Sequence, residues 1–173
     1  AGAGTVTLLA GGTNGLSETE ILVLSQDSPE VAGAAETQDA FGTSLAAGDV
    51  TGDGQTDLVI GAPRENHQGV VHLFPQGTGG PTGAGSTYVS AKTLKIVATT
   101  LSALDPEATG SDAGFGATAA VADTDGDGRD DIAVGAPVAK VGSVAGCGAV
   151  AVLRGATSGI SGSRSRLLTP STT

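Results

Sequence analysis

The sequence predicts an all-β fold made of repeated four-stranded antiparallel sheets. Its apolar residues alternate with polar ones or form runs of about four, which is strand length, and glycine bounds most of these runs. The same segments also recur 74 positions apart: Phe41-Gly42 returns as Phe115-Gly116, and Gly61 returns as Gly135. Such a repeat is typical of an array of similar units, in which each unit buries its apolar face against its neighbour.

Each complete unit is expected to contain four strands. The first strand follows Phe41 or Phe115, and the second follows the acidic loop that comes next. The third begins at Gly69 or Gly148, where short apolar runs follow the glycine. A Gly-rich turn then leads to the outer strand, which is expected at residues 93–97 in one unit and 165–168 in the other.

The N-terminal segment matches only the second half of a unit. Residues 4–9 resemble a third strand and residues 21–24 an outer strand, with a Gly-rich turn between them. The chain is therefore expected to form a single domain of two and a half units and ten strands. Its parts are the end of one unit (1–40), a second unit (41–114) and a third (115–173).

An acidic loop precedes the second strand of each complete unit. In the later loop, carboxylates stand at the first, third, fifth and ninth positions, and Gly126 and Gly128 let the backbone curl among them. Such a cluster repels itself unless a cation that prefers oxygen ligands neutralises it, and calcium is the usual one. The run leads directly into a strand, whereas an EF-hand loop is longer and is flanked by helices. The expected ligands are the side chains of Asp123, Asp125, Asp127 and Asp131 and the backbone carbonyl of Arg129.

The earlier loop has the same pattern with one change. Thr51 stands where the later loop has Asp125, so a hydroxyl or a water must replace a carboxylate, and weaker binding is predicted there. We therefore predict two calcium ions with a structural role, and the alternatives are a solvated acidic turn or a metal that bridges a ligand directly. The ligands expected in the earlier loop are Asp49, Thr51, Asp53, Asp57 and the backbone carbonyl of Gln55.

The order of these motifs resembles a known repeat. Phe-Gly, an Asp/Gly loop and then Gly-Ala-Pro, at 61–63 and again at 135–137, is similar to the FG-GAP repeat of integrin α-subunit β-propellers and their bacterial relatives. The resemblance implies propeller blades of four antiparallel strands, as in the integrin α N-terminal region. It also implies calcium in loops between the first and second strands of some blades, away from the usual ligand face.

The resemblance also implies a seven-bladed ring, which two and a half blades leave incomplete. A propeller needs about four to eight blades to close. We therefore expect either that other chains, identical or different, complete the ring, or that this sequence is one piece of a longer or cleaved protein.

Charge and motifs narrow the classes of function. A formal net charge of −10 argues against binding to nucleic acid or to an anionic membrane, and no apolar run is long enough to insert into a membrane. The motifs of serine hydrolases, zinc proteases and P-loop enzymes are missing from the sequence. Calcium sites of extracellular modules are weak, so the predicted sites favour a secreted protein whose signal peptide has been removed.

The resulting hypothesis is a secreted, calcium-stabilised, integrin-like propeller module without catalytic activity. Such a module would recognise a protein or a glycan, as in cell adhesion. The alternatives are an accessory propeller domain of a secreted hydrolase or toxin complex, with its catalytic part on another chain or segment, and a purely structural spacer.

Overall fold

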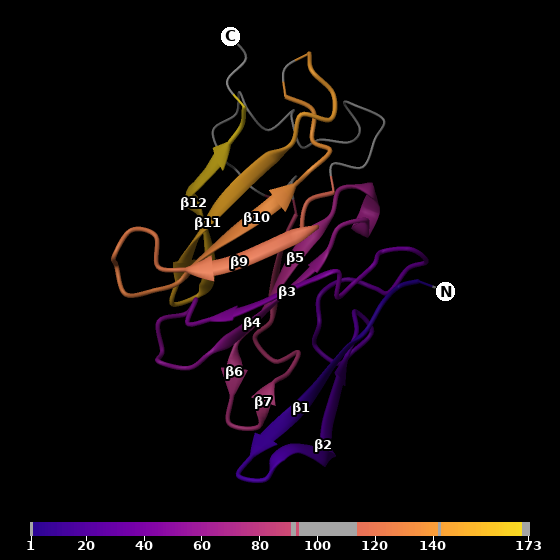
Figure 1. The fold of residues 1–173 in the computed structure, drawn as a ribbon, viewed down its shortest axis with the longest axis vertical. Helices are drawn as coiled ribbons and strands as arrows, with labels where there is room; N and C mark the ends of the chain where they lie inside the picture. Colours follow the sequence, from indigo (N-terminus) through magenta and orange to yellow (C-terminus); the bar gives the residue numbers. More distant parts are fainter. Residues whose placement is uncertain (1, 91–92, 94–113, 142, 171–173) are drawn as a thin grey trace.

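The computed structural model describes residues 2–90, 93, 114–141 and 143–170. In this part of the chain, strands and turns form nearly the whole structure, and the short 3-10 helix η1 (Glu65–His67) is the one helical element. The three larger of its four sheets follow one another along the long axis of the molecule (Figure 1). The predicted all-β fold of antiparallel sheets is confirmed.

Two of these sheets are four-stranded blades, and the third is a hairpin. In each blade the strands pair with their neighbours in chain order, all antiparallel. The hairpin consists of β1 (Val6–Gly12) and β2 (Gly15–Leu24). The central blade consists of β3 (Ser44–Gly48), β4 (Asp57–Ala62), β5 (Val70–Phe74) and β8 (Thr87–Ser90). The last blade consists of β9 (Thr118–Ala122), β10 (Asp131–Ala136), β11 (Ala149–Ala156) and β12 (Gly159–Leu168).

The outer strand of the central blade differs from the prediction. It is β8, which begins at Thr87, whereas the strand expected at 93–97 lies outside the described residues except for Thr93. Between β5 and β8 the chain forms a small additional hairpin of β6 (Gln76–Gly77) and β7 (Gly80–Pro81). Strands of two residues leave no alternation in the sequence, so the pattern could not reveal them.

The two phenylalanines of the repeat lie between neighbouring sheets. Phe41 is 3% exposed and packs in one apolar cluster with residues of the hairpin and of the central blade. Phe115 is fully buried in a second cluster, which joins the central blade to the last one. Each Phe therefore acts as a wedge between two neighbouring sheets.

Glycine allows the close approach of one blade to the next. Gly4 precedes β1 and Gly69 precedes β5, both with positive φ (+97° and +80°). A Cβ atom on either residue would collide with a backbone carbonyl of the following sheet, that of Phe41 or of Phe115. The Phe-Gly turn of one blade is thus seated on the glycine that opens the third strand of the blade before it.

Gly148 is the corresponding glycine of the last blade, and it faces a hollow. The nearest atom to a Cβ built there is the carbonyl oxygen of Pro137, at 3.2 Å, which belongs to the same blade. The hollow has a volume of about 540 Å³, and its lining includes Thr118, Gly148, Val150 and Leu168. The array of blades is therefore open at this end.

None of the helical structure in the described part of the chain has the length and apolar character needed to span a bilayer.

Candidate metal centre

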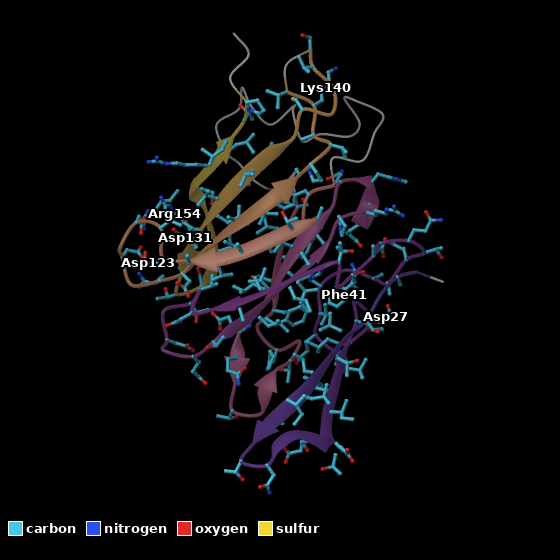
Figure 2. The ribbon with its side chains drawn as sticks, in the orientation of Figure 1. Asp27, Phe41, Asp123, Asp131, Lys140 and Arg154 are labelled. Carbon is cyan, nitrogen blue, oxygen red and sulfur yellow. The ribbon has the colours of Figure 1, made fainter. Side chains whose placement is uncertain are left out.

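The two acidic loops lie at the same end of their blades and touch one another. The β3–β4 loop holds Asp49, and the β9–β10 loop holds Asp130. The Asp130 carboxylate accepts a hydrogen bond from the backbone N–H of Asp49 at 2.8 Å, and the Asp130 N–H donates to the Asp49 carbonyl, also at 2.8 Å. Asp123, Asp131 and Arg154 lie together on the left in Figure 2, where the β9–β10 loop turns.

In the β9–β10 loop, the backbone wraps around the first carboxylate. Asp123 accepts hydrogen bonds from the N–H groups of Gly126, at 2.7 Å, and Gly128, at 3.0 Å. Both glycines have φ near +80°, the left-handed region that lets these N–H groups point inward. The bonds from Gly128 and Gly126 hold the pKa of Asp123 below its ordinary value, so this carboxylate stays ionised.

The ninth position of this loop is its most buried carboxylate. Asp131 opens β10 and accepts hydrogen bonds from the N–H of Thr124 at 3.2 Å and of Gly155 at 3.1 Å. The Thr124 hydroxyl and the Arg154 guanidinium also donate to it. Burial by itself raises the pKa of Asp131, but these hydrogen bonds outweigh it, so the pKa lies below its ordinary value.

Three of the predicted ligands come together around a small space. Asp123, Asp125 and Asp131 each offer a carboxylate oxygen, and these oxygens lie within 4.8 Å of one another. A set of carboxylate oxygens this close fits a hard cation such as calcium. Asp127 accepts a hydrogen bond from the Arg129 N–H at 3.0 Å and lies outside this group of three.

Two arginines from other strands reach the same carboxylates. Arg154, on β11, lies 3.3 Å from Asp125 in addition to its contact with Asp131. Arg164, on β12, lies 3.1 Å from Asp125 and 3.4 Å from Asp127. These positive groups compete with a metal ion for the same oxygens. These arginines lie 23 to 39 residues along the chain from the carboxylates that they contact, so the loop motif gives no signal of them.

The β3–β4 loop repeats the wrapping of the first carboxylate. Asp49 accepts hydrogen bonds from the N–H groups of Gly52, Asp53 and Gly54, at 2.8, 3.0 and 2.9 Å. Asp57 opens β4 and accepts bonds from the N–H of Thr51 at 2.9 Å and of Gln76 at 3.1 Å. The Asp57–Gln76 bond is the counterpart of the Asp131–Gly155 bond, which shows that the two loops share one architecture.

The carboxylates of the β3–β4 loop are arranged differently. In the part of the chain that the structure describes, Asp49, Asp53 and Asp57 do not form a group of three oxygens within 4.8 Å. Asp53 accepts a hydrogen bond from the Gln55 N–H at 2.8 Å. The Thr51 hydroxyl is buried and has no hydrogen-bond partner among the described residues, so it is available as a neutral oxygen ligand. In the central blade, the residue equivalent to Arg154 of the last blade is Pro75, which directly follows β5. This position therefore carries no guanidinium in the central blade.

Comparison with protein families identifies the repeat. The FG-GAP repeat model matches residues 41–74 and 115–153, from each Phe-Gly through the acidic loop to the third strand. The search of curated proteins found no match. FG-GAP repeats often bind calcium, and proteins that contain them are generally non-catalytic and typically extracellular. Residues 41–74 and 115–153 therefore match two FG-GAP repeats, and they lie in an open array of four-stranded antiparallel sheets.

Proposed function

We propose that this chain is a calcium-stabilised module of an extracellular propeller that binds a protein or a glycan. The observation that carries the proposal is the group of three carboxylates, Asp123, Asp125 and Asp131, gathered in the acidic loop of an FG-GAP repeat. A cation in this loop would remove the repulsion among them.

The proposed role of calcium is structural. In the later loop its ligands would be the gathered carboxylates, Asp127 and the Arg129 carbonyl. In the earlier loop they would be Asp49, Thr51, Asp53, Asp57 and the Gln55 carbonyl. Because Asp130 of one loop bonds to Asp49 of the other, ordering either loop supports its neighbour. Calcium would thus strengthen the contact between the two blades.

The proposed ligand surface lies at the opposite end of the blades. There the central blade has the short turn around η1, while the last blade has the longer segment 137–148 between β10 and β11. Loops of different length on similar rigid sheets are a common way to build a binding surface. Their difference supports recognition of a protein or glycan at this end.

The partner that completes the propeller is proposed to bring its own Phe-Gly turn. The hollow beside Gly148 corresponds to the places where Gly4 and Gly69 receive Phe41 and Phe115. Both Phe-Gly turns of this chain are already buried between its own sheets, and the third phenylalanine, Phe74, is followed by proline. A second copy of this chain therefore has no exposed Phe-Gly turn that could enter the hollow. This favours an FG-GAP blade of different sequence as the partner.

Thermal unfolding in calcium and in chelator tests the calcium proposal. Binding at about 100 times Kd stabilises a protein by about 2.7 kcal/mol, so calcium should raise the Tm of the wild-type chain by about 5–10 °C. Asp125→Ala should remove more of this calcium-dependent rise than Thr51→Ala, because Asp125 and Thr51 occupy the same position in the two loops and only Asp125 brings a charge.

The difference between calcium and chelator, measured within each variant, corrects for the arginine contacts that Asp125→Ala also removes. Equal loss of the calcium-dependent rise in both variants would contradict the unequal sites. Saturable binding in an array of defined glycans and extracellular proteins, lost when residues 138–147 are shortened, would support the ligand surface. The absence of any saturable ligand would indicate a structural spacer.

A further inference from the structure

The later acidic loop has one carboxylate more than the earlier loop, and two arginines from outside the loop contact that carboxylate. It belongs to Asp125, which stands at the position of Thr51 in the earlier loop. Arg154 lies 3.3 Å from the Asp125 carboxylate and Arg164 lies 3.1 Å from it. The added negative charge of this loop is therefore accompanied by added positive charge.

Arg154 is fixed beside the loop by several hydrogen bonds. Its side chain is 12% exposed, and its backbone N–H donates to Ser165 Oγ at 3.1 Å. Its Nη1 donates to Thr124 Oγ1 at 2.6 Å and to the Asp131 carboxylate. Figure 2 shows Arg154 close to Asp131 and Asp123 where the β9–β10 loop turns. A guanidinium remains protonated at any ordinary pH, so this side chain is a permanent positive charge next to the expected ligands.

Arg164 reaches the loop from an irregular stretch of β12. Val152 pairs with Arg166, but the next pair along the two strands is Arg154 with Ser161, so β12 holds extra residues between these pairs, Arg164 among them. Such a bulge turns side chains away from the directions of a regular strand. The guanidinium of Arg164 donates to Asp125 at 3.1 Å and to Asp127 at 3.4 Å. Its side chain is 57% exposed, so it can leave the loop without disturbing the core.

Neither the bulge nor the acidic loop requires these arginines. The pairing of β1 with β2 in the hairpin shifts in the same way, and there Ala10 and Glu20 stand at the positions of Arg154 and Arg164. The central blade has an acidic loop of the same architecture, with Pro75 at the position of Arg154. The two arginines are therefore particular to the last blade, where the extra carboxylate lies.

The arginines oppose a bound cation in two ways. Their N–H groups occupy carboxylate oxygens that a calcium ion would use, and their charge repels the ion. Repulsion between a divalent ion and one guanidinium near a hydrated, salt-screened surface amounts to roughly a three- to tenfold change in affinity. In return, the same contacts neutralise the carboxylates when calcium is scarce.

We propose that Arg154 and Arg164 set the calcium affinity of the later loop by acting as counter-ions tethered to the protein. This inference rests on the proposed function, because it concerns the calcium site proposed there. Arg154 is the fixed charge, and the more exposed Arg164 exchanges with the ion. The pair offsets part of the affinity that Asp125 adds, while the earlier loop has no such counter-ion at the position of Arg154.

A calcium titration of the full chain followed by NMR tests this proposal at each loop separately. The amide signals of Gly126 and Gly128 report on the later loop and those of Gly52 and Gly54 on the earlier one, because each donates to the first carboxylate of its own loop. In Arg164→Gln, the calcium concentration that half-saturates the later loop should fall roughly three- to tenfold. The value for the earlier loop should not change.

Two further variants control for charge and for side-chain shape. Arg166→Gln removes the same charge from the same strand, and Arg166 is exposed and contacts no carboxylate among the described residues, so this variant should leave both loops as in the wild type. Arg164→Lys keeps the charge and should lie closer to the wild type than Arg164→Gln does. An unchanged or increased half-saturating concentration for the later loop in Arg164→Gln would overturn the proposal.

Thermal unfolding tests the role of the arginines as counter-ions. Arg154→Gln leaves the buried Asp131 without its guanidinium, so it should lower the Tm more in chelator than in saturating calcium, where the ion neutralises the loop instead. Equal lowering in both solutions would overturn the counter-ion role. If Arg154→Gln does not fold, Arg164→Gln should show the same difference to a smaller extent, because its side chain is exposed.

The titration also separates this inference from the calcium proposal itself. If the glycine signals of neither loop respond to calcium in the wild type or in Arg164→Gln, both proposals fail. If the wild type responds and Arg164→Gln responds at the same concentration, the calcium proposal stands and the role of the arginines is refuted.

Discussion

At the residue scale, His72 is the least expected side chain of the core. It lies on β5 and is 1% exposed, and within the part of the chain that the structure describes both of its ring nitrogens are buried without hydrogen-bond partners. Its ring contacts are aromatic, with centroid distances of 5.4 Å to Phe41, 6.0 Å to Phe74 and 5.7 Å to Tyr88. Burial lowers the pKa of His72 to about 4, so the imidazole is neutral in the folded protein.

Replacement of His72 should therefore change how stability depends on pH. Between pH 6.5 and about 4, the unfolded chain binds a proton that the folded chain does not, so this residue lowers stability as the pH falls through that window. The loss amounts to about 2 kcal/mol between pH 7 and pH 5. His72→Leu should remove this component and should also stabilise the protein at pH 7, because two unpaired nitrogens leave the core.

Denaturant unfolding at pH 7 and pH 5 measures this effect, with the wild type as reference. Carboxylates titrate in both proteins and cancel in the difference between them. An unchanged pH dependence in His72→Leu would show that the imidazole finds a partner when it is protonated.

At the scale of elements, the two acidic loops act as one contact between blades. The β9–β10 loop lies against the β3–β4 loop, where a Cβ on Gly52 would fall 2.7 Å from Arg129 Cγ. Gly155, just after the Arg154 contact, likewise approaches the backbone of Val50 and Asp130 too closely for a side chain. Glycine at these positions allows the end of one blade to rest on the loop of its neighbour.

Asp130 should account for a measurable part of this contact. Asp130→Ala removes the acceptor of the Asp49 N–H and should lower the free energy of unfolding by about 1–2 kcal/mol. Asp130→Asn keeps an acceptor oxygen of the same shape and should lie closer to the wild type. Denaturant unfolding of the three proteins in chelator measures this without any metal contribution, and equal losses for Ala and Asn would contradict the hydrogen-bond role.

At the scale of the whole molecule, the open array leaves apolar surface at both ends. Val150 and Leu168, 40% and 56% exposed, border the hollow beside Gly148, and Leu9, Ile21 and Val23 are exposed on the hairpin. Exposed apolar faces and sheet edges of this kind favour association with further blades.

Light scattering on a sizing column in calcium tests that proposal. The chain alone should have the mass of a single 16.5 kDa copy, because copies have no spare Phe-Gly turn. Co-expression with a chain that carries further FG-GAP repeats should give a larger complex. Val150→Asp should prevent this complex, while Glu18→Gln, which lies outside the hollow, should not. A discrete oligomer of the chain by itself would show that copies complete the ring.

The sequence alone determined the class of fold, the strand order within each blade and the position of the acidic loops. These features depend on local signals: apolar residues at strand spacing, glycine at turns, and carboxylates at alternate positions of Asp123–Asp131. Their recurrence 74 positions later made the repeat visible without any knowledge of contacts. The outer strand β8 lies earlier in the chain than the sequence pattern predicts, because the residues before it form a hairpin too short to leave a pattern.

Only the tertiary structure decided which charges meet. Arg154 and Arg164 reach the later loop from β11 and β12, and Glu65 joins Glu36 and Asp39 across the boundary between two sheets. The same holds for Gly4 and Gly69, whose partners are carbonyls of the next blade. The physical reason is that electrostatic and steric contacts depend on distance in space, and folding brings together residues whose spacing along the chain carries no information about one another.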